Sequence, residues 1–299
     1  MKIIILLASV LAFISCKKDQ KEATISADKK MIAKAEDVVI ESHQDLYGSW
    51  VGDFVALEYS QDDSDGLINT NKINFILKKI VKDTVYGQSV VAGNLRPFKG
   101  TISEINNELI FVVMEPGNDK NDGKFEFKIL RDTLSGVWTA NSKKKKVIKR
   151  EYKLVKQEFK YNPKLMLPED GQFVDYYDTK TVTENYDNGD GTVETYSEQV
   201  YRTASSVIST LNASTTKLQE IDVKNLKKLE LEIIRNTIFA RHGYTFKKKT
   251  YRQFFDPVAW YVPVSNDVSG SLSDLEKENI TLLKRFEKYA IDNYDTFGR

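Results

Sequence analysis

Few side chains of this chain are suited to catalysis or metal binding. Its 299 residues include two histidines, His43 and His242, and a single cysteine, Cys16. A Ser-His-Asp or Cys-His arrangement would have to use His242, because His43 lies in a polar N-terminal segment and Cys16 ends an apolar run. Zinc sites of the usual Cys/His type are excluded by the same count. The 43 acidic residues leave a glycosidase-like pair of carboxylates open, and nothing points to one.

Two acidic loops, residues 62–66 and 187–191, have the composition of calcium-binding loops. If the last glycine of each is aligned with the invariant glycine of an EF-hand loop, the first ligand position falls on Gln61 or Tyr186. Neither residue is a carboxylate, so both segments are predicted to be turns. The net charge of +1 provides no field that favours nucleic acid. We therefore expect no metal, no cofactor and no nucleic-acid partner.

The first residues predict an exported and lipid-anchored protein. Residues 3–14 form an apolar run that is too short to span a bilayer, which takes about 20 residues, but that suits a signal peptide. Ser15 directly before Cys16 resembles the bacterial lipoprotein box, and a lone cysteine at this junction favours lipidation over a place in the core. We expect a signal peptide at residues 1–15 and a lipidated polar tether at residues 16–44.

The resemblance to Gram-negative lipoproteins implies attachment to the outer membrane, because Lys17 rather than aspartate follows the cysteine. The charged cluster at residues 17–22 resembles surface-export tags of Bacteroidetes lipoproteins. A plain polar tether would have a similar composition, so the side of the membrane stays open.

Residues 45–158 are predicted to form an antiparallel β-barrel of about eight strands. Short apolar segments alternate there with turn signals at the spacing of a β-meander. Segments 72–78 and 124–129 alternate apolar and polar residues, which predicts one buried face and one face in solvent. Lys72, Asn74 and Lys78 are the predicted solvent-facing residues of the first segment. Eight strands suffice to close a small barrel that holds one ligand.

Two Gly-x-Trp motifs mark the ends of this segment. Gly48 and Trp50 open the first strand, and Gly136 and Trp138 repeat the motif near the last one. Arg150 shares the parity of the apolar face of the last strand, where the face of a tryptophan would be a suitable partner. A Gly-x-Trp motif covered by a basic residue resembles lipocalin-like barrels. This resemblance implies that the five residues close the barrel base; the two tryptophans would serve equally well as core anchors.

Residues 159–220 are predicted to be a linker that contains a β-hairpin, with segments 181–186 and 192–201 as its strands. No capping box opens the stretch 203–218, which fits either a short helix or an irregular connection.

Residues 221–299 change to helical periodicity. Leu226, Leu229 and Ile233 recur at helical spacing, and Gly243 stands where such a helix would end. A second short helix is expected at residues 249–255. Ser273 and Glu276 form a capping box that opens a last helix. We therefore expect an α+β protein with two folded parts, a barrel followed by a small helical domain with an aromatic centre.

This C-terminal unit resembles the YARHG family, small domains of bacterial envelope proteins without a settled biochemical activity. The resemblance rests on Arg235, Asn236, Arg241, His242, Gly243, Tyr244, Trp260 and Tyr261. The leading tyrosine of the motif is Phe239 here, so no hydroxyl is available at that position.

The motif allows two interpretations. Five positive side chains against Asp256 leave a net charge of +4 between residues 241 and 263, interleaved with aromatic residues, which is a composition that can hold anionic polymers. The same residues also fit a helix end and a small aromatic core, and we favour this second interpretation.

The sequence thus predicts a non-catalytic binding or structural lipoprotein. Its barrel would hold a small apolar ligand, and its helical domain would contact an envelope polymer or a protein partner. The alternative is an envelope-polymer hydrolase that uses carboxylates and His242.

Overall fold

The computed structural model of the chain describes residues 41–60, 70–117, 119 and 121–292. The predicted signal peptide, the lipidation site at Cys16, most of the tether and the turn at 62–66 lie outside the described residues. Within the described part, no helix is long and apolar enough to cross a lipid bilayer.

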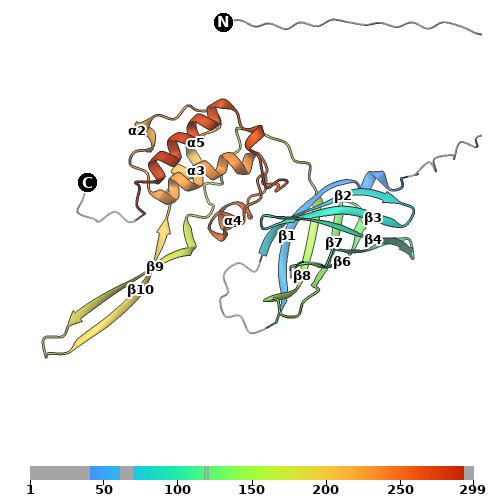
Figure 1. Ribbon diagram of the computed structural model, residues 1–299, viewed down its shortest axis with the longest axis horizontal. Helices are drawn as coiled ribbons and strands as arrows, with labels where there is room; N and C mark the ends of the chain where they lie inside the picture. Colours follow the sequence, from blue (N-terminus) through green and yellow to red (C-terminus); the bar gives the residue numbers. More distant parts are fainter. Residues whose placement is uncertain (1–40, 61–69, 118, 120, 293–299) are drawn as a thin grey trace, which may run out of the picture. The chain divides into compact units, whose positions relative to one another are not determined.

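The N-terminal part is a closed antiparallel barrel of eight strands in consecutive order, which confirms the predicted fold (Figure 1). A 3-10 turn, η1 (Gln44–Leu46), precedes the first strand. The strands are β1 (Gly48–Tyr59), β2 (Thr70–Val81), β3 (Thr84–Val91), β4 (Asn94–Ile105), β5 (Glu108–Met114), β6 (Gly123–Leu130), β7 (Thr133–Ala140) and β8 (Val147–Lys156). Pairing of β1 with β8 closes the barrel.

Short turns set the register of these strands. Asn106 and Asn107, between β4 and β5, both have positive φ, at 52° and 62°. Two successive residues with positive φ form the two-residue turn whose twist matches that of antiparallel strands, and asparagine tolerates this conformation.

Aromatic rings fill the barrel interior. Phe75 and Phe98 stack with ring centres 4.3 Å apart, and Phe111 and Phe127 stack at 4.6 Å. Phe125 is 1% exposed and packs against several of these rings. These inward residues alternate with residues on the outer face, as the strand period requires.

The outer face of β2 differs from the prediction. Lys72 and Asn74 were expected in solvent, but they are only 7% and 0% exposed. The backbone N–H of Lys72 donates to Asp256 Oδ2 at 3.3 Å, and its Nζ donates to the carbonyl of Val258. Asn74 Nδ2 donates to the carbonyl of Pro263 at 3.0 Å. The prediction was wrong because residues 256–263 cover this face of the strand.

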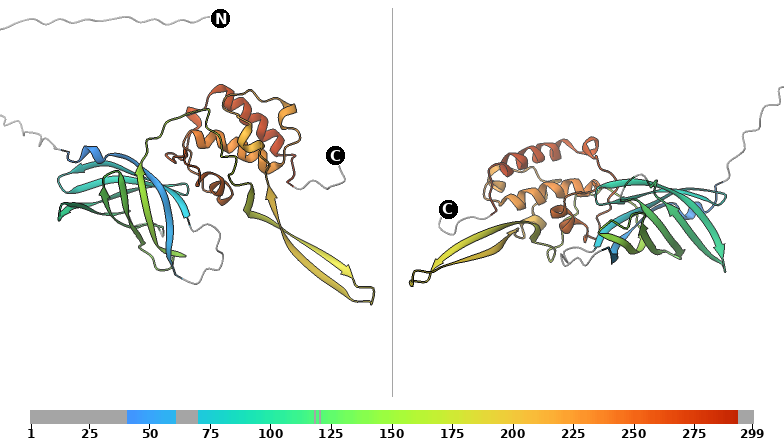
Figure 2. Two further views of the ribbon diagram at one scale, coloured as in Figure 1. Left: turned by 180° about the vertical axis from the view of Figure 1, so that it is seen from behind. Right: turned by 60° about the horizontal axis from the view of Figure 1, so that its bottom comes forward.

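A separate two-stranded sheet follows the barrel. Its strands are β9 (Val174–Asp187) and β10 (Val193–Thr203), longer than predicted, and they form a twisted ribbon (Figures 1 and 2). A single helical turn, α1 (Val207–Thr210), and an irregular segment occupy the stretch for which the sequence left both alternatives open.

The C-terminal part is helical. Its elements are α2 (Glu220–Val223), α3 (Lys228–Arg241), α4 (Lys249–Phe255), the 3-10 turn η2 (Ser269–Ser271) and α5 (Asp274–Glu287). The predicted capping box of α5 is present, with Ser273 Oγ accepting from the Glu276 N–H at 3.2 Å. At the centre of this helical part, the rings of Phe246 and Phe255 stack with their centres 4.7 Å apart.

Gly243 ends α3 as predicted. Its φ is +74°, a left-handed conformation that glycine adopts without steric cost. The Tyr244 N–H donates to the carbonyl of Phe239 at 3.0 Å, and the Gly243 N–H donates to that of Ala240 at 2.9 Å. These two bonds define a Schellman motif, which satisfies carbonyls at the helix end.

Candidate functional site

The residues of the YARHG-like motif, on α3 and after it, lie in two environments. Arg241, His242, Trp260 and Tyr261 point into contacts that hold the fold together. Arg235, Asn236, Phe239 and Tyr244 line a groove instead.

Arg241 connects the end of α3 to the segment that precedes the helices. Its side chain donates from Nε to the carbonyl of Leu165 at 2.6 Å, from Nη1 to Ser214 Oγ at 2.9 Å, and from Nη2 to Met166 Sδ at 3.0 Å. Arg241 is 1% exposed, and burial lowers its pKa to about 10, so that it stays charged at neutral pH. The guanidinium therefore binds residues 165, 166 and 214.

His242 connects the end of α3 to the beginning of α5. Its Nε2 lies 2.9 Å from Glu276 Oε2, and the Tyr161 ring stacks on the imidazole at 4.3 Å. The Tyr161 hydroxyl donates to Glu276 Oε1 at 3.2 Å. Only 5% of the histidine side chain is exposed. A general base must reach the proton that it removes, and this imidazole is enclosed by its structural partners.

Glu276 is a shared acceptor at this junction. Burial alone would raise its pKa, but hydrogen bonds from Ser214, the Ser273 N–H and His242 outweigh that effect and lower the pKa below its ordinary value. The carboxylate therefore stays ionised. It accepts hydrogen bonds from His242 at the end of α3 and from the Ser273 N–H at the beginning of α5.

Trp260 and Tyr261 hold neighbouring segments in place. Trp260 Nε1 donates to the carbonyl of Met166 at 2.8 Å, and the Tyr261 hydroxyl donates to that of Tyr244 at 2.7 Å. Both partners belong to segments that flank α3, so these residues also serve packing.

The groove lies along α3 and α5, which run side by side (Figure 1). Its volume is about 670 Å³, and the loops at residues 244–248 and 266–269 complete its walls. The lining residues are Arg235, Asn236, Phe239, Tyr244, Phe246, Lys247, Lys248, Tyr251, Asn266, Asp267, Val268, Ser269, Leu272, Lys277, Ile280, Thr281 and Lys284.

The groove is basic, since five cationic residues and one carboxylate give its lining a net charge of +4. Lys248 pairs with Asp178 at 3.1 Å, Lys277 with Asp274 at 3.1 Å, and Arg235 with Glu287. Within the described residues, Lys247 and Lys284 have no ion-pair partner, and both are exposed. These two ammonium groups are available to an anionic ligand.

Aromatic rings form one wall of the groove. Tyr244 packs edge-on against Phe246 at 5.1 Å, and Phe246 packs edge-on against Tyr251 at 6.0 Å. The Phe239 ring lies 6.0 Å from Tyr244 and is partly buried. Positive charge lies beside these rings, since Arg235 lies over the Phe239 ring at 6.0 Å and Lys248 over the Tyr251 ring at 5.4 Å. Phe239 lacks the hydroxyl that a tyrosine at this position would supply.

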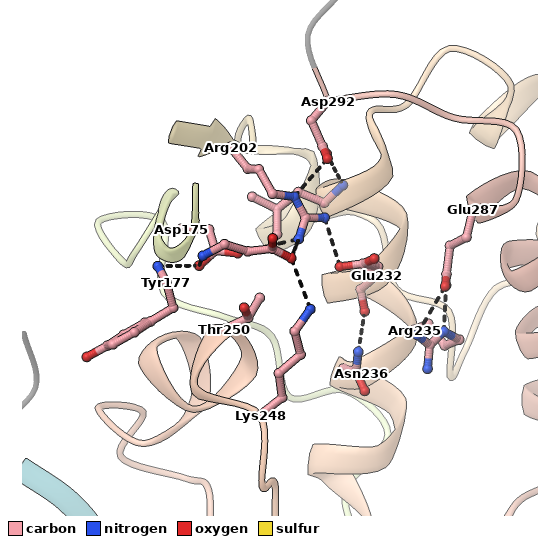
Figure 3. A network of polar contacts seen from close by, with 12 residues as sticks. Asp175, Tyr177, Arg202, Glu232, Arg235, Asn236, Lys248, Thr250, Glu287 and Asp292 are labelled. Carbon is pink, nitrogen blue, oxygen red and sulfur yellow. Dashed lines mark hydrogen bonds and ion pairs between the residues drawn. The ribbon is translucent and has the colours of Figure 1, made fainter. Parts of the chain in front are cut away.

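Arg202 fixes the base of the β9–β10 hairpin beside the groove (Figure 3). Its guanidinium pairs with Glu232 at 2.9 Å, Asp292 at 2.7 Å, Asp178 at 3.0 Å and Asp175 at 3.4 Å. Burial would lower the pKa of Arg202, but Glu232 and Asp292 raise it above its ordinary value. Asp178 also accepts from Lys248, so this network positions one of the groove lysines.

The predicted barrel-closing residues lie at several places on the barrel. Trp50 is 2% exposed and donates from Nε1 to the carbonyl of Leu46 at 3.0 Å. Lys156 of β8 lies over its ring at 5.7 Å. Gly48, two residues before Trp50, has a φ of 110°. A basic residue of the last strand therefore covers the first tryptophan.

Arg150 has a different aromatic contact from the one expected. Its guanidinium lies over the Phe54 ring at 5.2 Å, and Nη1 donates to the carbonyl of Phe54 at 2.9 Å. Trp138 donates from Nε1 to Glu115 Oε2 at 3.4 Å. At Gly136, a Cβ would lie 2.2 Å from the carbonyl oxygen of Glu126, so the close approach of two strands requires glycine there.

Sequence reasoning missed the contribution of α5 to the groove. Lys277, Ile280, Thr281 and Lys284 recur at i, i+3, i+4 and i+7, which places them on one helix face. That spacing was visible in the sequence. The sequence could not show that this face of α5 lies opposite α3, because residues about 40 positions apart come together only through the tertiary fold.

The chain is therefore a two-part protein, a closed eight-stranded barrel followed by a small helical domain that carries a basic and aromatic groove. Residues 206–288 match the YARHG domain family, and this part of the chain is a YARHG domain. No curated protein and no solved structure matches the chain.

Proposed function

We propose that this protein is a lipid-anchored, non-catalytic binding protein of the bacterial envelope. Acyl chains on Cys16 would attach it to the outer membrane, and the polar residues that follow would tether the folded part. The YARHG domain would bind an anionic envelope polymer in the groove between α3 and α5.

One observation carries this proposal: among the described residues, two ammonium groups without an ion-pair partner stand beside aromatic rings in one groove. Lys247 and Lys284 can neutralise anionic groups, and the rings of Tyr244 and Tyr251 offer apolar surface to a ligand. A carboxylate-bearing glycan or peptide polymer offers both kinds of group.

The barrel supports a structural role better than a ligand-binding one. The small apolar ligand suggested by the resemblance to lipocalin-like barrels would have to displace the stacked rings of Phe75, Phe98, Phe111 and Phe127. Such displacement would cost packing energy in an interior of normal density. We therefore assign ligand binding to the groove.

The hydrolase alternative receives little support from the surroundings of His242. Its imidazole is held by Glu276 and Tyr161, and the Ser214 hydroxyl accepts from Arg241. A substrate would have to break these contacts to reach the histidine.

Co-sedimentation of the full chain with purified sacculi tests the proposal. Lys247→Ala with Lys284→Ala should weaken binding about tenfold at low ionic strength, since two charge contacts are lost. The matched control, Lys164→Ala with Lys224→Ala, removes two exposed lysines outside the groove and should bind as the parent does. Equal binding by both double variants and the parent would refute the groove as the site.

A further inference from the structure

The β9–β10 hairpin extends well beyond its anchored base. Within the described residues, the side chains of 179–201 form hydrogen bonds only with one another, for example Thr183 with Ser197 at 2.9 Å and Thr195 with Asn185 at 2.9 Å. Nearly all of these residues are exposed. A two-stranded ribbon alone is marginally stable in water, so a hairpin of this length is well suited to being covered by a partner.

The two faces of this hairpin differ in chemistry. Residues directly opposite in the register share a face, so the pairs Glu184 with Tyr196 and Tyr186 with Glu194 lie on one side. We call this side the acidic–tyrosine face; Val182 with Glu198 extends it. The opposite side, the threonine face, carries uncharged polar residues such as Thr183 and Thr195.

The acidic–tyrosine face exposes rings beside carboxylates. Tyr186 is 54% exposed and Tyr196 is 59% exposed, values that leave much of each ring in water. The whole hairpin, residues 179–201, carries five carboxylates against Lys180, a net charge of −4. Glu184, Glu194 and Glu198 lie on the acidic–tyrosine face, together with Lys180. Like charges on facing strands are unfavourable, so pairing of this hairpin with the same hairpin of another copy is disfavoured.

The groove of the YARHG domain has the complementary properties. Its lining carries a net charge of +4 and presents Phe239, Tyr244 and Tyr251 beside Lys247 and Lys284. The pairing of hairpin carboxylate with groove lysine already occurs within one copy, where Asp178 at the hairpin base accepts from Lys248 at 3.1 Å.

We propose that the acidic–tyrosine face of one copy docks in the groove of a second copy. This inference rests on the groove being the binding site proposed above, and it names a partner for that site. The strand from residue 179 to the turn reaches roughly 30 Å at the rise of a β-strand. The hairpin runs away from α3 and α5 (Figures 1 and 2), so its distal half lies away from the groove of its own copy.

This contact joins two different surfaces, so it is heterologous and leaves a free groove and a free hairpin at the ends of any open assembly. Copies would therefore form rings or short chains. A polymer that carries carboxylates would compete with the hairpin for the same lysines, which couples self-association to ligand binding.

Sedimentation velocity of the full chain over a range of concentrations tests this proposal. The parent should associate at low ionic strength and dissociate as salt screens the charges. The hairpin variant Glu184→Lys with Glu194→Lys, and the groove variant Lys247→Glu with Lys284→Glu, should each weaken association about tenfold or more. The control Thr183→Lys with Thr195→Lys puts two lysines on the threonine face and should associate as the parent does.

Mixing the two reversed variants is the decisive step. The parental hairpin of the groove variant can dock in the parental groove of the hairpin variant, and the two reversed surfaces also attract each other. An equimolar mixture should therefore recover association, which damage to folding could not produce. A monomeric parent, association unaffected by either variant, or a mixture without recovery would overturn the proposal.

Sacculi binding separates this inference from the proposed function. The hairpin variant should retain sacculi binding while the groove variant loses it. Groove-dependent sacculi binding without groove-dependent self-association would refute the docking alone. Groove-dependent self-association without groove-dependent sacculi binding would support the docking and refute the polymer as the ligand.

Discussion

Replacement of Gly243 by alanine should destabilise the YARHG domain by about 2–4 kcal/mol. Alanine at a φ of +74° costs about 1 kcal/mol relative to glycine. The added Cβ would also lie 2.5 Å from Val264 Cγ2, 3.0 Å from Phe159 Cε2 and 3.1 Å from the Val262 carbonyl oxygen. Overpacking of this kind costs roughly 1–3 kcal/mol.

Two other glycines separate the contributions to that cost. Gly189 has a similar φ of +76° with nothing within 4 Å of a Cβ, so Gly189→Ala should show about 1 kcal/mol of local strain in the hairpin turn. Gly270 has neither a positive φ nor a close neighbour, and Gly270→Ala should change stability by less than about 0.5 kcal/mol.

Urea denaturation followed by far-UV circular dichroism compares Gly243→Ala with Gly270→Ala, because the helical signal comes from the YARHG domain. A midpoint for Gly243→Ala equal to that of Gly270→Ala would refute the description of this helix end. It would mean that the chain after α3 does not make the tight turn on which the positions of Tyr244 and Val264 depend.

Three further predictions concern the parts around the groove. Because the pKa of Glu276 is lowered in the folded protein, its carboxylate contributes stability above the ordinary pKa of 4.5 and loses it as pH falls. The stability gap between the parent and Glu276→Gln in urea titrations should therefore shrink from pH 7 to pH 3, and a constant gap would contradict the hydrogen bonds that this carboxylate accepts. Arg202→Ala leaves buried carboxylates unpaired and should cost about 3–5 kcal/mol, seen as faster proteolysis of β9–β10, whereas unchanged proteolysis would argue against the network. Phe125→Ala should cost about 3–5 kcal/mol by thermal unfolding if the barrel is packed; a negligible change would instead indicate an adaptable interior.

Local sequence patterns predicted those features that depend on neighbours along the chain. Alternation and turn residues gave the eight strands, since each strand needs only one apolar face and a turn. The Schellman motif at Gly243 and the capping box at Ser273 were predictable for the same reason, because the residues that make these bonds lie within one helical turn.

Features that depend on distant segments were not predictable. The alternation of β2 showed which side faces the barrel, but it could not show that residues 256–263 bury Lys72 and Asn74. The motif indicated a helix end at Arg241, but it could not show that the guanidinium binds residues 165, 166 and 214.

The candidate site was predicted in part. The basic and aromatic stretch after Gly243 includes Lys247 and Lys248, which line the groove. Lys249 instead lies over Tyr177 at 5.1 Å, and Arg252 pairs with Asp256. Composition cannot distinguish these lysines and arginines, because the start of α4 rotates successive side chains to different sides.

Hydrogen exchange of the full chain with and without soluble, carboxylate-bearing fragments of sacculi tests the central claim most directly. The claim is that the groove between α3 and α5 binds and that the barrel and the buried part of the motif support it. We predict that added fragments slow exchange in residues 244–251 and 277–284 and leave β1–β8 unchanged. Slower exchange confined to the barrel, or to residues around His242 without the groove, would contradict the account.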